Sequence, residues 1–214
     1  MKLRDQENMI VLGIFLGTTA LVAALVLAVV SQLTAEPIRE AAERNREQAF
    51  HRLLLPEFDR IGESAEHDGF IFYTVYNGEQ AVGFVGQGVT RAGYGGEIEV
   101  LVGFDRSGKI TGVQILRHKE TPGLGANVCE RKFQRTIFNI GGEVPAVPEN
   151  RLLDQFNGLA AFSAGDWRIS KDGGEFEYLT GATVTSRAVT ALINDIAIAF
   201  AGLDSGIGDG EDIR

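Results

Sequence analysis

The sequence predicts an α+β protein, with an N-terminal transmembrane helix and helical stalk followed by an antiparallel sheet with packed helices. Three observations support this class. An uncharged apolar run lies near the N-terminus, at residues 9–30. Segments rich in β-branched and aromatic residues, separated by turn residues, fill the middle of the chain. A final apolar segment with helical periodicity, residues 183–200, precedes a glycine-rich acidic tail.

The run at residues 9–30 carries no charge, and only Thr18 and Thr19 are distinctly polar. A helix of this length spans roughly 30 Å, the thickness of the hydrocarbon core of a bilayer. A cleaved signal peptide has a shorter apolar region and a small-x-small cleavage site. The best such site here carries the large residue Leu33. We therefore expect a retained, single-pass membrane anchor.

The orientation of this anchor is predicted from the arrangement of the chain. Basic residues flank the span on both sides, so their count alone does not determine the orientation. A short N-terminal stub before a large domain is the usual arrangement of a single anchor. We therefore expect residues 1–8 in the cytoplasm and the domain at residues 57–201 outside.

Residues 31–56 are predicted to continue the membrane helix outward as a stalk. Thr34 could cap a helix whose first turn contains Pro37, and Pro56 would end it.

Four strands are predicted after the stalk, in two antiparallel hairpins. Asn77-Gly78 is typical of a type I′ turn, and residues 106–109 are expected to form the second turn. Between the hairpins, residues 86–96 contain five glycines and are predicted to be a loop. The predicted strands are residues 70–76, 81–86, 98–104 and 110–116.

The remaining predictions cover the C-terminal half of the chain. A helix is expected at residues 183–200, beginning at Thr183 or Thr185, before a flexible acidic tail at residues 202–214. The other predictions are an amphipathic helix at residues 128–140, an irregular segment at 143–156 and one or two short strands within 159–169.

Composition excludes several classes of function. The hydrophobic content of 44% is that of a globular chain, and the net charge of −9 argues against a nucleic-acid-binding protein. Because Cys129 is the one cysteine, no intrachain disulfide, cysteine-ligated iron–sulfur cluster or multi-cysteine zinc site can form. The three histidines lack a metal-binding spacing, so no metal site is predicted.

Two motifs are candidates for ligand binding. The first, TGATVTS at residues 180–186, places four hydroxyl residues beside small residues at the predicted start of a helix, which favours an anion. Simple helix capping would explain the same residues. The second, HKETPGLG at residues 118–125, joins a predicted strand to a predicted helix. Its proline and glycines indicate a kinked loop that could lie against a planar ligand, or an ordinary turn.

Together, these motifs resemble the FMN-binding domain of the G subunit of Rnf-type electron transport complexes, also called Rsx. The resemblance covers nearly the whole chain, including the membrane helix, the stalk and KDGG at residues 171–174. The chain is similar as well to the C subunit of the sodium-translocating NADH:quinone reductase. The compact length and the segment from Lys171 to Val189 favour the Rnf protein.

The resemblance implies that a flavin transferase links FMN to a threonine through a phosphoester. The acceptor is the last residue of the pattern D-x-x-[ST]-G-A-T, which is Thr183 here, while Glu177 replaces the aspartate. The other residues implied at the cofactor are Thr180, Gly181, Ala182, Thr185 and Ser186 near the phosphate, Glu120, Thr121, Gly123, Leu124 and Gly125 near the ring, and Tyr94 as a weaker candidate.

The implied function is electron relay at the bacterial inner membrane, with the domain on the periplasmic side. The complex would couple electron flow between ferredoxin and NAD to ion movement. The chain would work with other membrane, flavin and iron–sulfur subunits, without a catalytic residue or a substrate of its own. Two alternatives remain at this point: the quinone reductase protein, and a membrane-anchored scaffold without redox chemistry.

Overall fold

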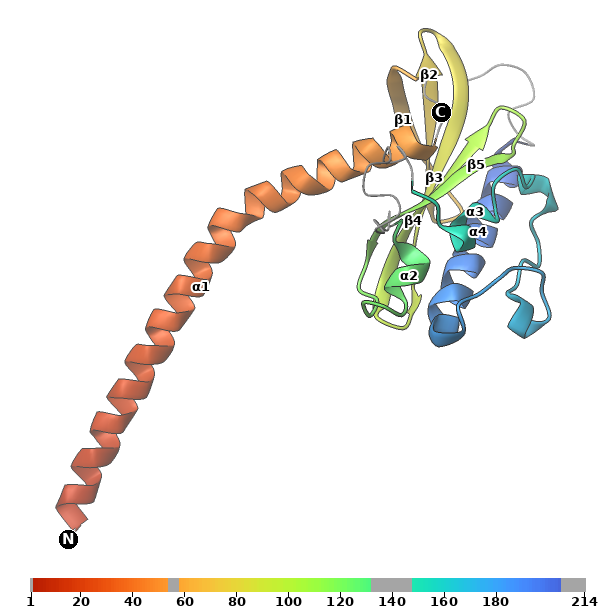
Figure 1. The fold of residues 1–214 in the computed structure, drawn as a ribbon. Helices are drawn as coiled ribbons and strands as arrows, with labels where there is room; N and C mark the ends of the chain where they lie inside the picture. Colours follow the sequence, from red (N-terminus) through yellow and green to blue (C-terminus); the bar gives the residue numbers. More distant parts are fainter. Residues whose placement is uncertain (1, 54–57, 132–147, 205–214) are drawn as a thin grey trace, which may run out of the picture. The chain divides into compact units, whose positions relative to one another are not determined.

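The computed structural model describes residues 2–53, 58–131 and 148–204, and divides the chain into two compact units (Figure 1). The first unit, Met1–Asn45, contains most of α1 (Lys2–Leu53). The second unit, Arg46–Arg214, contains the end of α1, the sheet and the remaining helices.

Helix α1 contains the predicted membrane span. Its segment Val11–Ala41 is long and apolar enough to cross a bilayer, and none of its most apolar stretch is buried within the protein. The hydroxyls of Thr18 and Thr19 donate to carbonyls of the preceding turn at 2.9 Å. The polar groups of the span are therefore satisfied within the helix itself.

The prediction that Thr34 caps a new helix is wrong. Helix α1 runs without interruption through Thr34 and contains Pro37 in its interior. The Thr34 hydroxyl donates to the carbonyl of Val30 at 2.8 Å, as hydroxyls do inside a helix. The predicted end at Pro56 lies outside the described residues.

The second unit is built on a five-stranded antiparallel sheet in the order β1-β2-β3-β4-β5. Each strand therefore pairs with its neighbours in sequence. The strands are β1 (Arg60–His67), β2 (Phe70–Asn77), β3 (Gln80–Gly93), β4 (Gly96–Asp105) and β5 (Ile110–His118).

Both faces of the sheet are covered. Helix α4 (Thr183–Asp204) lies against one face, where the rings of Phe104 and Phe200 stack with centroids 4.2 Å apart. The end of α1 supplies Phe50 and Leu53 to a smaller cluster with Leu101 on the sheet. Helix α4 is also long and apolar enough to span a membrane, but 67% of that stretch is buried in the core.

The predicted loop at residues 86–96 is instead the end of β3 and the start of β4. At Gly86 and Gly88, an added Cβ atom would lie 2.6 and 2.9 Å from the side chain of Ile196 on α4. These glycines therefore lie in a strand because the helix packs directly on its backbone. The turn itself contains only Tyr94 and Gly95 between the paired residues Gly93 and Gly96.

The first hairpins differ from the prediction in detail. Asn77 pairs with Gln80, so Gly78 and Glu79 form the turn, and Gly78 has a positive φ of 61°. Glycine at the first turn position is the type II′ pattern rather than type I′. Strand β1 was not predicted, although Asp68 and Gly69, both with positive φ, carry the type I′ signal that precedes β2.

The C-terminal half contains mostly short elements. The strands predicted within residues 159–169 are reduced to isolated bridges, Lys109 with Ala160 and Ile169 with Phe176. Ser163 closes a turn there by donating to the carbonyl of Ala160 at 2.7 Å. The short elements are α2 (Ala126–Cys129), α3 (Arg151–Asp154), η1 (Ala161–Ser163), η2 (Ser170–Asp172) and η3 (Thr180–Ala182).

Three further predictions are corrected in part. A helix was expected at residues 128–140, but α2 ends at Cys129. Residues 132–140 of that prediction lie outside the described residues. The segment expected to be irregular contains α3. Helix α4 continues to Asp204, past the predicted end at residue 200, and residues 205–214 of the tail lie outside the described residues.

Candidate functional site

A cavity of about 440 Å³ lies beside the N-terminal end of α4, within the size range of small-molecule sites. Three segments that are distant in sequence line it: the β3–β4 turn, the loop after β5, and η3 with the first turn of α4. The lining residues are Tyr94, Glu120, Thr121, Leu124, Gly125, Thr180, Gly181, Ala182, Thr183, Val184 and Thr185.

The TGATVTS segment forms a tight turn that leads directly into α4. The backbone N–H of Ala182 donates to the carbonyl of Leu179 at 2.8 Å. The buried hydroxyl of Ser186 accepts from the N–H of Leu179 and donates to the carbonyl of Ala182. Ser186 therefore stabilises the turn, and it does not line the cavity.

Thr183 is the first residue of the 22-residue helix α4 and faces the cavity. Its hydroxyl makes one long hydrogen bond, 3.4 Å, to the carbonyl of Thr180. The side chain is half-buried, and the positive end of the helix dipole lies beside it. This hydroxyl is thus accessible and lies where a phosphate would be favoured.

Glu120 connects all three segments of the cavity wall. Its carboxylate accepts from the N–H of Gly95 at 3.0 Å and from the hydroxyl of Thr185 at 2.7 Å. The side chain is only 5% exposed. A Cβ atom at Gly125 would lie 2.8 Å from the Thr185 hydroxyl and would overlap the Glu120 carboxylate. Only glycine fits at that position beside this pair.

The turn between β3 and β4 packs closely against the loop after β5. A Cβ atom at Gly95 would overlap the carbonyl of Lys119, and Gly96 has a positive φ of 103°. The glycines that suggested a loop in the sequence therefore allow two backbones to approach each other at the cavity.

Three exposed side chains with apolar surface line the cavity. Tyr94, Leu124 and Val184 are 75%, 48% and 42% exposed, and each comes from a different lining segment. Such exposed apolar groups beside a cavity are typical of a ligand site.

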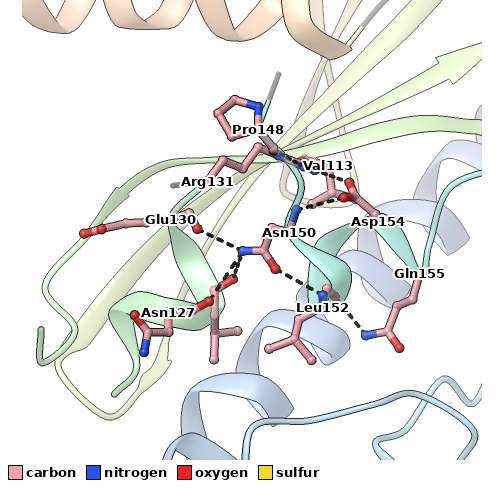
Figure 2. Close-up of polar contacts among 10 residues, drawn as sticks. Val113, Asn127, Glu130, Arg131, Pro148, Asn150, Leu152, Asp154 and Gln155 are labelled. Atoms are coloured by element: carbon pink, nitrogen blue, oxygen red, sulfur yellow. Dashed lines mark hydrogen bonds and ion pairs between the residues drawn. The ribbon is translucent and has the colours of Figure 1, made fainter. Parts of the chain in front are cut away.

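After the second lining segment, a polar network joins the end of α2 to α3 (Figure 2). Asn150 donates from its side-chain amide to the carbonyls of Val128 and Glu130 at 3.1 and 3.0 Å, at the C-terminal end of α2. Its side-chain oxygen accepts from the N–H of Leu152, which caps α3.

Arg131 extends this network. Its guanidinium donates to the carbonyls of Val113 and Pro148 at 3.0 and 3.1 Å, and pairs with Asp154 at 2.6 Å (Figure 2). Only 5% of its side chain is exposed. The network was not predicted from the sequence, because the contacts of Arg131 span 17 to 23 residues and follow no motif.

Glu177, the acidic residue of the modification pattern, lies outside the cavity lining but is held firmly. Its backbone N–H donates to the side-chain oxygen of Gln155 at 2.7 Å, and its carbonyl accepts from the same amide at 3.2 Å. The carboxylate pairs with Arg151 at 2.8 Å on the surface.

One ion pair and one thiol near the site have shifted pKa values. A hydrogen bond from Arg187, one turn after Thr183, lowers the pKa of Asp172. Burial raises the pKa of the Cys129 thiol to about 12, and the carboxylates of Glu120 and Glu130 add to this shift. Cys129 is therefore a protonated, unreactive thiol at neutral pH.

Of the residues implied at the cofactor, the structure brings ten together around the cavity and leaves out Gly123 and Ser186. Val184 also lines the cavity but was not predicted. The signal available for it was its place inside TGATVTS, between two residues that were predicted.

Two family models match the chain. The model of the FMN-binding domain matches residues 93–197, which contain every segment lining the cavity. The model of the RnfG N-terminal region matches residues 1–53, which end where α1 ends.

Curated relatives match almost end to end. The chain is 29% identical to the G subunit of the ion-translocating oxidoreductase complex of Shewanella piezotolerans, over 91% of both chains. It is 26% identical to the protein of the same name from Vibrio cholerae, and 28% to that from Salmonella typhi, over 85% of each chain. With the apolar helix, the sheet and the cavity on the matched segments, the chain belongs to the family of G subunits of Rnf-type ion-translocating oxidoreductase complexes.

Proposed function

We propose that this chain is the membrane-anchored flavoprotein subunit of an ion-translocating oxidoreductase complex, with FMN attached covalently to Thr183. It relays electrons between redox partners in the complex and turns over no substrate of its own. The observation that carries the proposal is the accessible Thr183 hydroxyl at the start of a long helix, beside a ligand-sized cavity.

The residues of the cavity fit a flavin phosphate ester. The start of α4 favours the negative charge that remains on a phosphodiester. Leu124, Tyr94 and Val184 offer apolar surface for a ring system, and the glycine-rich walls allow backbone groups to approach its polar edge. When bound, FMN supplies the redox chemistry, while the chain holds it, orients it and sets its electrostatic surroundings.

In the modification, the Thr183 oxygen bonds to the phosphorus of the FMN group while the bond from that phosphorus to its leaving group breaks. The donor is a flavin dinucleotide, whose nucleoside monophosphate leaves with the hydroxyl proton, so the protein gains the mass of one FMN less one water. A flavin transferase is the expected catalyst, with Glu177 in the place of the aspartate of its recognition pattern.

The first test is the intact mass and peptide map of the chain co-expressed with a flavin transferase. We expect one FMN group on the peptide that contains Thr183, and complete loss of this group in Thr183→Ala. The conservative variant Thr183→Ser retains a hydroxyl and is expected to restore attachment.

Each contrary result has a distinct meaning. An FMN group that persists in Thr183→Ala would place the attachment elsewhere. An unmodified wild-type chain together with a modified Glu177→Asp variant would show that Glu177 prevents recognition. If neither chain is modified, the scaffold alternative replaces the redox function.

We further propose that α1 crosses the inner membrane once, with the N-terminus in the cytoplasm and the domain in the periplasm. The apolar span and its place before a large folded unit support this orientation. The other partners are then the membrane, flavin and iron–sulfur subunits of the complex.

A further inference from the structure

A buried carboxylate, that of Glu120, forms part of the cavity wall. Among the described residues that line the cavity, Glu120 alone carries a charged side chain. At 5% exposure, this group is largely removed from water. Burial of a charge is unfavourable unless other groups compensate it, so its presence at this point requires an explanation.

The groups around Glu120 are donors without charge. Gly95 and Thr185 each donate one hydrogen bond, so both carboxylate oxygens act as acceptors, as suits the ionised form. The backbone N–H of Glu120 donates to Nδ1 of His118 at 3.2 Å, so this nitrogen carries no proton. In the part of the chain that the structure describes, no ion pair joins Glu120 to a lysine, arginine or histidine.

The negative charge of Glu120 would act electrostatically on a flavin bound in the cavity. A flavin bound here would accept two electrons from a redox partner of the complex and one proton from solvent, which at neutral pH would give an anionic reduced form. The reduced form is one unit more negative than the oxidised form. A fixed negative charge in a poorly hydrated wall therefore disfavours reduction, because little solvent screens the repulsion.

From this geometry, we infer that Glu120 holds the reduction potential of the flavin low, as a buried carboxylate of the cavity wall that accepts its described hydrogen bonds from uncharged donors. The inference rests on the proposed function, since it needs a flavin at Thr183. It assigns Glu120 an electrostatic role beyond its contacts with Gly95 and Thr185.

The test compares midpoint potentials of flavin-loaded, full-length variants by spectroelectrochemical titration. Glu120→Gln keeps the size and one of the two acceptor oxygens but removes the charge. We expect it to shift the ratio of reduced to oxidised flavin by about tenfold towards reduction at a fixed applied potential. For a two-electron couple, this shift corresponds to about 30 mV.

Glu130→Gln is the matched control. Glu130 lies ten residues later, is 37% exposed and does not line the cavity, so solvent screens its charge. At the same applied potential, we expect its ratio of reduced to oxidised flavin to stay within twofold of the wild-type ratio. An unchanged potential in Glu120→Gln, or an equal shift in both variants, would overturn the inference.

A second pair of variants tests the same electrostatic effect if Glu120→Gln does not fold. Thr121 is exposed and lines the cavity, so Thr121→Lys adds a cation without altering the contacts of Glu120. We expect Thr121→Lys to have a higher potential than Thr121→Gln, and equal potentials would contradict the inference.

The mass of each chain is measured first, which separates this inference from the function on which it rests. A wild-type chain without FMN on Thr183 overturns both. If the chain carries FMN but Glu120→Gln does not change its potential, the proposed function stands and only the electrostatic role of Glu120 is overturned.

Discussion

The side-chain amide of Asn150 performs two tasks at once. It satisfies carbonyls at the end of α2 and caps the start of α3, while only 8% of the residue is exposed. Helix ends leave backbone groups without partners, and two very short helices meet here. Asn150 thus joins the end of α2, the helix that follows the loop at residues 121–125, to the start of α3.

Asn150→Ala is expected to lower the free energy of unfolding by about 3 kcal/mol. The variant loses a helix cap and leaves buried carbonyls without donors. Chemical denaturation of the second unit measures this change. Asn157→Ala is the control, because Asn157 is exposed, and its loss is expected within about 0.5 kcal/mol. Equal losses in the two variants would show that the network contributes little.

At the scale of elements, the contact between α4 and β3 determines where the cavity forms. Gly86 and Gly88 let the helix approach the strand, and this approach brings Thr185 within hydrogen-bonding distance of Glu120. The cavity therefore depends on packing at a distance from its own lining.

Gly86→Ala is expected to cost about 1–2 kcal/mol of folding stability. The new methyl group would lie 2.6 Å from Ile196 and 2.9 Å from the Phe72 ring, so the helix must shift. Thermal unfolding measures the loss. The same change at Gly165, where an added Cβ meets nothing within 4 Å, serves as the control and is expected to leave stability unchanged or slightly higher.

The contrast between correct and incorrect predictions follows from the range of the interactions involved. The strands at residues 98–104 and 110–116 were predicted because their local pattern and turn suffice. The strand predicted at residues 81–86 continues in β3 through Gly88 to Gly93. This continuation was predicted as a loop because its glycines make room for Ile196, on a helix more than a hundred residues later. Likewise, TGATVTS and HKETPGLG indicated a site, but the bond between Glu120 and Thr185 spans 65 residues and has no sequence signal.

For the whole molecule, the membrane topology can be tested with the chain's own single cysteine as an internal blank. Cys129 is buried, and its pKa is raised to about 12, so it should not react with a maleimide in the folded protein. An introduced cysteine is then the one reactive thiol expected among the described residues.

Asp166→Cys is expected to react with a membrane-impermeant maleimide added to the periplasm of intact cells. Asp166 is 71% exposed, and its surface pair with Arg168 contributes little to stability. Lys2→Cys, in the N-terminal stub, is expected to react only after the inner membrane is opened. The reverse pattern would place the domain in the cytoplasm.

The order of the strands and helices along the chain also determines when the cavity can form during translation. The sheet is a simple meander in which every strand pairs with the one before it, so it needs only short-range contacts to form. Thr183 lies on α4, the last helix of the described residues. Thr185 on the same helix bonds to Glu120, which follows the last strand of the sheet. The strands of the sheet therefore leave the ribosome before the cavity can form, and Thr183, the proposed FMN acceptor, is among the last groups to reach its place.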